Sequence, residues 1–142
     1  MEKRTMIPLA TRLRPGQDIL RELELMAEKH EIEASCVLTC VGSLTTACLR
    51  FANRQEATVM NGHFEIVSLT GVLSRYGSHF HIAIADGQGT TLGAHLLPGS
   101  AVYTTAEIVL GVFSGLRFMR TLDPQTGFPE LDIHSISKEQ AT

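Results

Sequence analysis

Cysteine is scarce in this chain, and its pattern argues against a disulfide framework. Only Cys36, Cys40 and Cys48 are present, an odd number, and each lies in an apolar segment. None of them belongs to a Cys-x-x-Cys pair. We therefore expect reduced thiols packed in the core, rather than disulfides or metal ligands.

Long apolar runs and an excess of positive charge are also missing. No apolar stretch approaches the length of a membrane span, and the N-terminus lacks the apolar core of a secretory signal. We therefore expect a cytoplasmic protein with no membrane partner. The formal net charge is −3. Because nucleic-acid modules carry a basic surface, the sequence supports direct DNA binding only weakly.

Two motifs that would indicate well-known chemistries are absent. No serine lies in a Gly-x-Ser-x-Gly sequence, so we expect no serine nucleophile. Gly87-Gln88-Gly89 is not followed by Gly-Lys-Ser/Thr, so it predicts a turn and not a phosphate-binding loop.

The composition of the chain is typical of one globular domain. The 142 residues are 44% hydrophobic and 19% charged, which is typical of a chain that buries a real core. No repeat, low-complexity segment or linker divides the sequence. We expect a single domain over residues 1–142, with a polar, frayed tail from about residue 135.

Hydrophobic periodicity predicts one helix followed by many strands. Ile19, Leu20, Leu23 and Ala27 recur at helical spacing, so residues 17–30 are expected to form one long helix. The short connections favour an α+β fold with a mostly antiparallel sheet, flanked by that long helix and by short ones where the connections allow them. The expected strands are residues 5–13, 34–41, 46–51, 57–60, 63–73, 79–85, 90–97, 104–113 and 116–122.

Turn signals separate these strands. Gly42-Ser43 is a candidate interruption between the second and third strands, and Asn61-Gly62 predicts a hairpin turn between the fourth and fifth. Residues 123–127 form a further turn sequence.

Three histidines are the strongest candidates for a binding site. His79 and His81 share one face of a strand, because side chains alternate along it, and His95 lies on the next strand. If residues 87–89 form a three-residue loop with Gly89 left-handed, His95 lies directly opposite His81. A two-residue loop would place His95 on the opposite face. The sequence leaves both registers open.

Such a cluster would suit a metal ion. Neutral imidazole suits zinc and other borderline divalent ions, and three protein ligands leave one position for water or a small anion. Two interpretations of His79, His81 and His95 remain open. They either bind a divalent ion, with zinc preferred, or are half-exposed side chains hydrogen-bonded to the backbone.

A catalytic ion would also need a proton acceptor, for which Glu107 is the candidate. An acid buried in an apolar strand must be paired or must perform some task. The alternative role for Glu107 is a structural ion pair, with Arg120 or across a subunit interface. No spacing in the sequence shows that Glu107 faces the histidines.

Several segments resemble the plants-and-prokaryotes-conserved (PPC) domain in their order and spacing. Gly62-His63-Phe64-Glu65-Ile66-Val67-Ser68-Leu69-Thr70-Gly71 is similar to a Gly-Arg-Phe-Glu-Ile-Leu-Ser-Leu-Ser-Gly stretch of that domain. The resemblance is to the stand-alone prokaryotic branch and covers nearly the whole chain. The further matching segments are Leu13-Arg14-Pro15-Gly16, His79-Phe80-His81, Gly93-Ala94-His95-Leu96, Thr104-Thr105-Ala106-Glu107-Ile108, Arg120 with Asp123, Thr126-Gly127 and Glu130-Leu131.

The resemblance implies an antiparallel sheet with short helices and, as a partner, further copies of the chain in a homotrimer. In plant members the domain mediates self-association and contacts with other proteins, while a separate AT-hook binds DNA. No Arg-Gly-Arg-Pro core occurs here, and His63 replaces the arginine of the plant motif. Prokaryotic relatives carry a DNA-binding label, which the charge of this chain supports little.

These observations order the functional expectations. The first is a small oligomeric binding or regulatory protein of PPC type, with a metal or small-ligand site at the histidines and a protein or small molecule as its ligand. The second is a metal-dependent enzyme acting on a small molecule in a cleft between subunits. The third is DNA binding through a basic face formed only on trimerisation.

Overall fold

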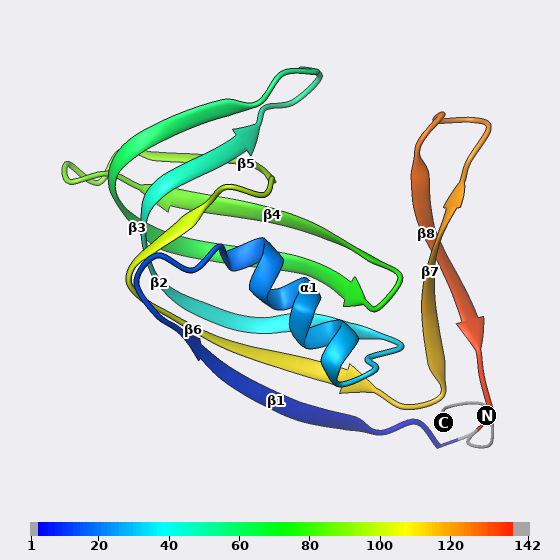
Figure 1. The fold of residues 1–142 in the computed structure, drawn as a ribbon. Coiled ribbons are helices and arrows are strands. Elements are labelled where there is room, and N and C mark those ends of the chain that lie inside the picture. The colour runs from blue at the N-terminus through cyan, green and yellow to red at the C-terminus, as the bar shows by residue number, and fades with distance from the viewer. Residues whose placement is uncertain (1–2, 138–142) are drawn as a thin grey trace.

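A helix packed on a six-stranded antiparallel sheet, followed by a two-stranded hairpin, makes up the fold (Figure 1). The computed structural model describes residues 3–137. The expected, mostly antiparallel sheet is therefore confirmed. The elements are β1 (Met6–Leu13), α1 (Ile19–Lys29), β2 (Ser35–Arg50), β3 (Thr58–Ser74), β4 (Gly77–Ala85), β5 (Thr91–Leu96), β6 (Ala101–Phe113), β7 (Leu116–Leu122) and β8 (Pro129–Ser135).

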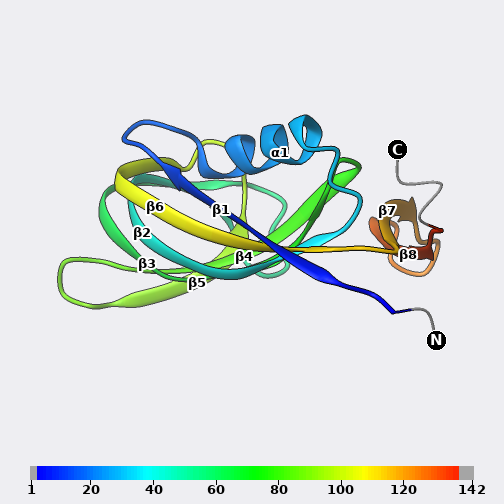
Figure 2. The same ribbon diagram turned by 90° about the horizontal axis from the view of Figure 1, so that it is seen from below.

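The main sheet partly closes on itself, because the long strand β2 pairs with both β3 and β5. Its order is β1-β6-β2-β3-β4-β5, and the end of β2 also pairs with β5, where Leu49 faces Leu96 and Arg50 faces His95. Strands β2 to β5 therefore form a ring at that end, which places the end of β2 beside the histidine hairpin. The β7–β8 hairpin lies apart from the sheet, near the turn that joins β3 to β4 (Figures 1 and 2).

The core lies between α1 and one face of the sheet (Figure 2). The helix buries Ile19, Leu20, Leu23 and Ala27, as its spacing predicts. On β4 the inward side chains are Phe80, Ile82 and Ile84, each at most 2% exposed. Burying one such side chain contributes about 1.5–3 kcal/mol. Alternation along β4 then turns the histidines to the outer face.

The expectation of one long helix is wrong, because α1 has only 11 residues, about three turns. Asp18 begins it by accepting hydrogen bonds from the backbone N–H groups of Leu20 and Arg21. His30 caps the C-terminal end, and Glu31 follows with a φ of +48°, which stops the helix. No second helix occurs between residues 3 and 137.

The expected hairpin at Asn61-Gly62 is also wrong, because β3 runs without a turn from Thr58 to Ser74. Asn61 pairs with Thr46 on β2, and its side-chain Oδ1 accepts a hydrogen bond from the Thr46 hydroxyl. The polar segment 51–57 makes the connection between β2 and β3 instead. A register shift between Leu44 and Thr46 lets the two long strands stay paired on both sides of it.

Two further expectations change in detail. Gly42 does not interrupt β2, because it lies in the strand where β6 approaches: a Cβ there would lie 2.1 Å from the Thr105 carbonyl oxygen. The strand β8 was not expected, and it pairs with β7 after the predicted turn at residues 123–127. Of the expected frayed tail, Ser135 ends β8 and Ile136 is buried, while residues 138–142 lie outside the described part.

Two remaining expectations concern the cysteines and a membrane span. All three cysteines are free, and burial raises the pKa of the Cys40 thiol to about 11. Within the described residues, the one helix is too short and too polar to cross a bilayer.

Candidate metal centre

The loop between β4 and β5 decides the position of His95. The Asp86 N–H donates to the Thr90 carbonyl at 3.0 Å, so Gly87, Gln88 and Gly89 form the loop. Gly89 has a φ of +79°, a conformation that favours glycine. The Asp86 carboxylate accepts the N–H groups of Gln88 and Thr90, which holds the turn together. Of the two registers that the sequence leaves open, the structure therefore has the three-residue loop.

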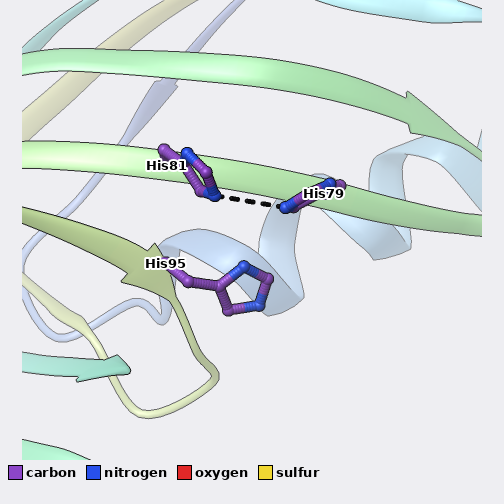
Figure 3. Close-up of side chains that lie close together, drawn as sticks. All are labelled: His79, His81 and His95. Carbon is purple, nitrogen blue, oxygen red and sulfur yellow. Dashed lines mark hydrogen bonds between the residues drawn. The ribbon is translucent and has the colours of Figure 1, made fainter. Parts of the chain in front are cut away.

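This register brings the three histidines together. His81 faces His95 across the β4–β5 pair, and His79 follows on the same side of β4. The ligand nitrogens of the three rings all lie within 4.8 Å of one another. The Nε2 atoms of His79 and His81 are 3.2 Å apart, with one donating to the other according to tautomer. Figure 3 shows the three rings gathered in one space beside the two strands.

Burial and nearby positive charge favour the neutral form of His79 and His95. The pKa of His95 is lowered to about 4, first by burial, then by the positive charge of Arg50 and by the other two histidines. The pKa of His79 is also lowered, first by burial, then by His81 and Arg120. Neutral imidazole is the form that binds metal ions.

A broad open hollow of about 1380 Å³ lies beside the cluster. Its polar lining comes from many elements of the fold rather than from one segment. The end of β2 contributes Arg50, α1 contributes Glu24, and the β7–β8 hairpin contributes Arg120 and Glu130. Ser78 donates to Glu24 at 2.9 Å, which connects the helix to the start of β4.

The structure corrects the expectation about Glu107. Its side chain is exposed on β6, between the buried Ala106 and Ile108, so it is not a buried acid. In the strand pairing it faces Arg12 and Val41, and Arg120 lies elsewhere, on β7. The acids that line the hollow, among the described residues, are Glu24 and Glu130.

The other histidines lie away from the cluster. His30 caps α1, as its place at the helix end predicts. His63 is exposed, as expected, and stacks on Tyr103 with ring centroids 4.4 Å apart. His134 is also exposed and lies 2.9 Å from the Asp132 carboxylate.

Sequence reasoning missed Arg50 and Glu24 as neighbours of the histidines. No local signal marks either residue, because each reaches the hollow only through long-range packing. Arg120 and Glu130 did belong to the segments that resemble the PPC domain, which is the one sequence signal that pointed to them.

Curated proteins with a similar sequence match most of this chain. It is 46% identical over 127 residues to the bifunctional protein GlmU of Synechococcus sp. strain JA-3-3Ab, a match that covers 89% of this chain and 20% of that protein. The chain thus spans about a fifth of the length of the curated relatives it matches.

Solved structures share the whole fold. A hypothetical protein from Salmonella cholerae-suis is 37% identical, with a TM-score of 0.91, covering 94% of this chain and 97% of that one. A plant- and prokaryote-conserved protein from Pyrococcus horikoshii has a TM-score of 0.77 over 96% and 99% of the two chains. At 21% identity, this second likeness shows the fold alone.

A family model connects the sequence resemblance to the structure. The Plants and Prokaryotes Conserved (PCC) domain, written PPC above, matches residues 1–114, which include the sheet and all three histidines. The β7–β8 hairpin follows the matched region. The chain therefore belongs to the family of the Plants and Prokaryotes Conserved domain.

Proposed function

We propose that this chain is a small oligomeric binding protein that holds a divalent metal ion, zinc in preference, on His79, His81 and His95. One observation carries the proposal: three imidazoles from two paired strands place their ligand nitrogens within 4.8 Å of one another. Three imidazole ligands are a known zinc set, with a fourth position left for water or a ligand.

The distances support a tetrahedral ion. With Zn–N bonds of about 2.05 Å, two ligand nitrogens in a tetrahedral site lie about 3.3 Å apart. The Nε2 atoms of His79 and His81 are already 3.2 Å apart. His95 is partly exposed, so rotation of its side chain can bring its nitrogen to a similar distance.

The test is metal content measured on purified protein by mass spectrometry. We expect about one zinc ion per chain in the wild type and almost none in His81→Ala. The control is His63→Ala, which removes an exposed histidine on β3 and should leave the zinc unchanged. Equal and negligible zinc in all three proteins would end the proposal.

Self-association is the second part of the proposal, as a homotrimer. Several large apolar side chains are exposed on the single chain, among them Leu38, Val41 and Val67, which are 46%, 57% and 56% exposed. Packing against other subunits would remove these side chains from water. Light scattering should give three times the mass of the chain, and a stable monomer at micromolar concentration would contradict the proposal.

A metal-dependent enzyme is the second candidate function, favoured by the acids at the hollow. Glu24 and Glu130 line the same space as the histidines and are the carboxylates available there to accept a proton. A zinc-loaded crystal structure distinguishes the two functions. A zinc-bound water within hydrogen-bond reach of either carboxylate supports the enzyme, and a closed four-ligand site opposes it.

A further inference from the structure

Two arginines from distant parts of the chain flank the histidine cluster. Arg50, at the end of β2, faces His95 in the β2–β5 pairing. Arg120 comes from β7, and its side chain lies against Gly77, two residues before His79. Both line the same hollow as the three histidines.

The charges of both arginines act on the cluster. The positive charge of Arg50 lowers the pKa of His95 and of His79, and that of Arg120 lowers the pKa of His79. Glu130 is the charged neighbour of Arg120. Arg50 makes no ion pair or side-chain hydrogen bond with any residue from 3 to 137, so its five N–H donors remain available to a ligand.

The hollow is positive although the chain is acidic. Its charged lining consists of Arg50, Arg54 and Arg120 against Glu24 and Glu130, whereas the whole chain carries −3. Three neutral imidazoles do not neutralise a divalent ion. A bound ion would therefore add its full positive charge and an open coordination position to the same space.

We propose that the hollow binds a small organic anion, whose carboxylate or phosphate group takes the open metal position and is held by Arg50 and Arg120. Arginine fits both groups because its planar donors form paired hydrogen bonds with two oxygens. This inference rests on the proposed metal centre and names the class of ligand that it takes. It also gives a role to the β7–β8 hairpin, because Arg120 belongs to β7. This hairpin lies beyond the residues that the family model matches.

The experiment titrates the zinc-loaded full chain by calorimetry with three probes of similar size: benzoate, phenyl phosphate and neutral benzamide. We expect one or both anions to bind and benzamide not to bind. A preference between benzoate and phenyl phosphate identifies which oxyanion the site takes. Arg50→Gln and Arg120→Gln should each weaken anion binding at least about tenfold, the scale of a lost charge-assisted hydrogen bond.

Zinc content and thermal midpoint are measured on every variant, which separates this inference from the proposed function. Arg21→Gln is the matched control, because its side chain on α1 is 72% exposed, and it should bind the anions like the wild type. A wild type without zinc would overturn both the metal centre and the inference. A zinc-loaded wild type that ignores both anions, or arginine variants that bind them unchanged, would overturn the inference alone.

Discussion

Replacement of Gly71 by alanine tests the close approach of β3 to β4 beside the histidine cluster. Gly71 faces Phe80 in the β3–β4 pairing, one residue from His79. A Cβ atom at position 71 would lie 2.1 Å from the His79 carbonyl oxygen and 2.6 Å from Cδ1 of Phe80. Phe80 is 1% exposed and cannot move aside easily. The two strands would therefore have to separate at the site.

Two costs combine in Gly71→Ala. Overpacking a dense interior costs about 1–3 kcal/mol. The φ of Gly71 is +156°, which L-residues rarely adopt, and such backbone strain costs about 1–3 kcal/mol more. We expect a loss of about 2–6 kcal/mol from a total free energy of unfolding of about 5–15 kcal/mol. Urea unfolding followed by circular dichroism, with a chelator present, measures this loss without a metal contribution.

Gly93→Ala is the control, a glycine on β5 that pairs with Ala83 on the outer face of the sheet. A Cβ at Gly93 meets the Ile82 carbonyl oxygen at 3.4 Å, an ordinary contact, and the φ of Gly93 is not positive. It should change the free energy of unfolding by less than about 1 kcal/mol. A Gly71→Ala protein within about 0.5 kcal/mol of the wild type, or a Gly93→Ala protein equally destabilised, would refute the reasoning.

Three further predictions address the core, the helix cap and the pH dependence. Leu23→Ala empties a fully buried position and should cost about 2–5 kcal/mol in urea unfolding, whereas the exposed Leu25→Ala should cost less than about 0.5 kcal/mol. Asp18→Ala removes the carboxylate that caps α1 and should cost about 1–2 kcal/mol in the same assay. In metal-free protein, the unfolded chain binds more protons at His95 between pH 4 and 6.5, so the urea midpoint should rise with pH there. For Cys40 the sign reverses, because the folded chain holds its proton from about pH 9 to 11, so the midpoint should fall with rising pH.

Local chemistry explains which parts of the fold were predictable from the sequence. The loop at residues 87–89 contains Gly89 at the left-handed position and Asp86 to bind the turn, which is why the three-residue loop was one of the two registers that the sequence allowed. That register placed His95 opposite His81. The buried face of α1 followed in the same way from the spacing of its apolar residues.

The same kind of signal failed where distant strands competed with it. Asn61-Gly62 has the composition of a hairpin turn, but its pairing with Thr46 on β2 keeps β3 extended. Glu107 lies in an apolar strand, yet alternation on β6 exposes its side chain, because only the neighbours of a strand decide which face is buried.

The sequence by itself thus determined the buried face of the helix, the presence of a hairpin between the histidines and the possibility of a metal site, because each depends on residues close together along the chain. Only the tertiary structure decided what surrounds that site. The pairing of β2 with β5 brings Arg50 to His95, and the β7–β8 hairpin brings Arg120 to the start of β4. These contacts join segments dozens of residues apart, and the packing of the whole sheet, not local preference, selects them.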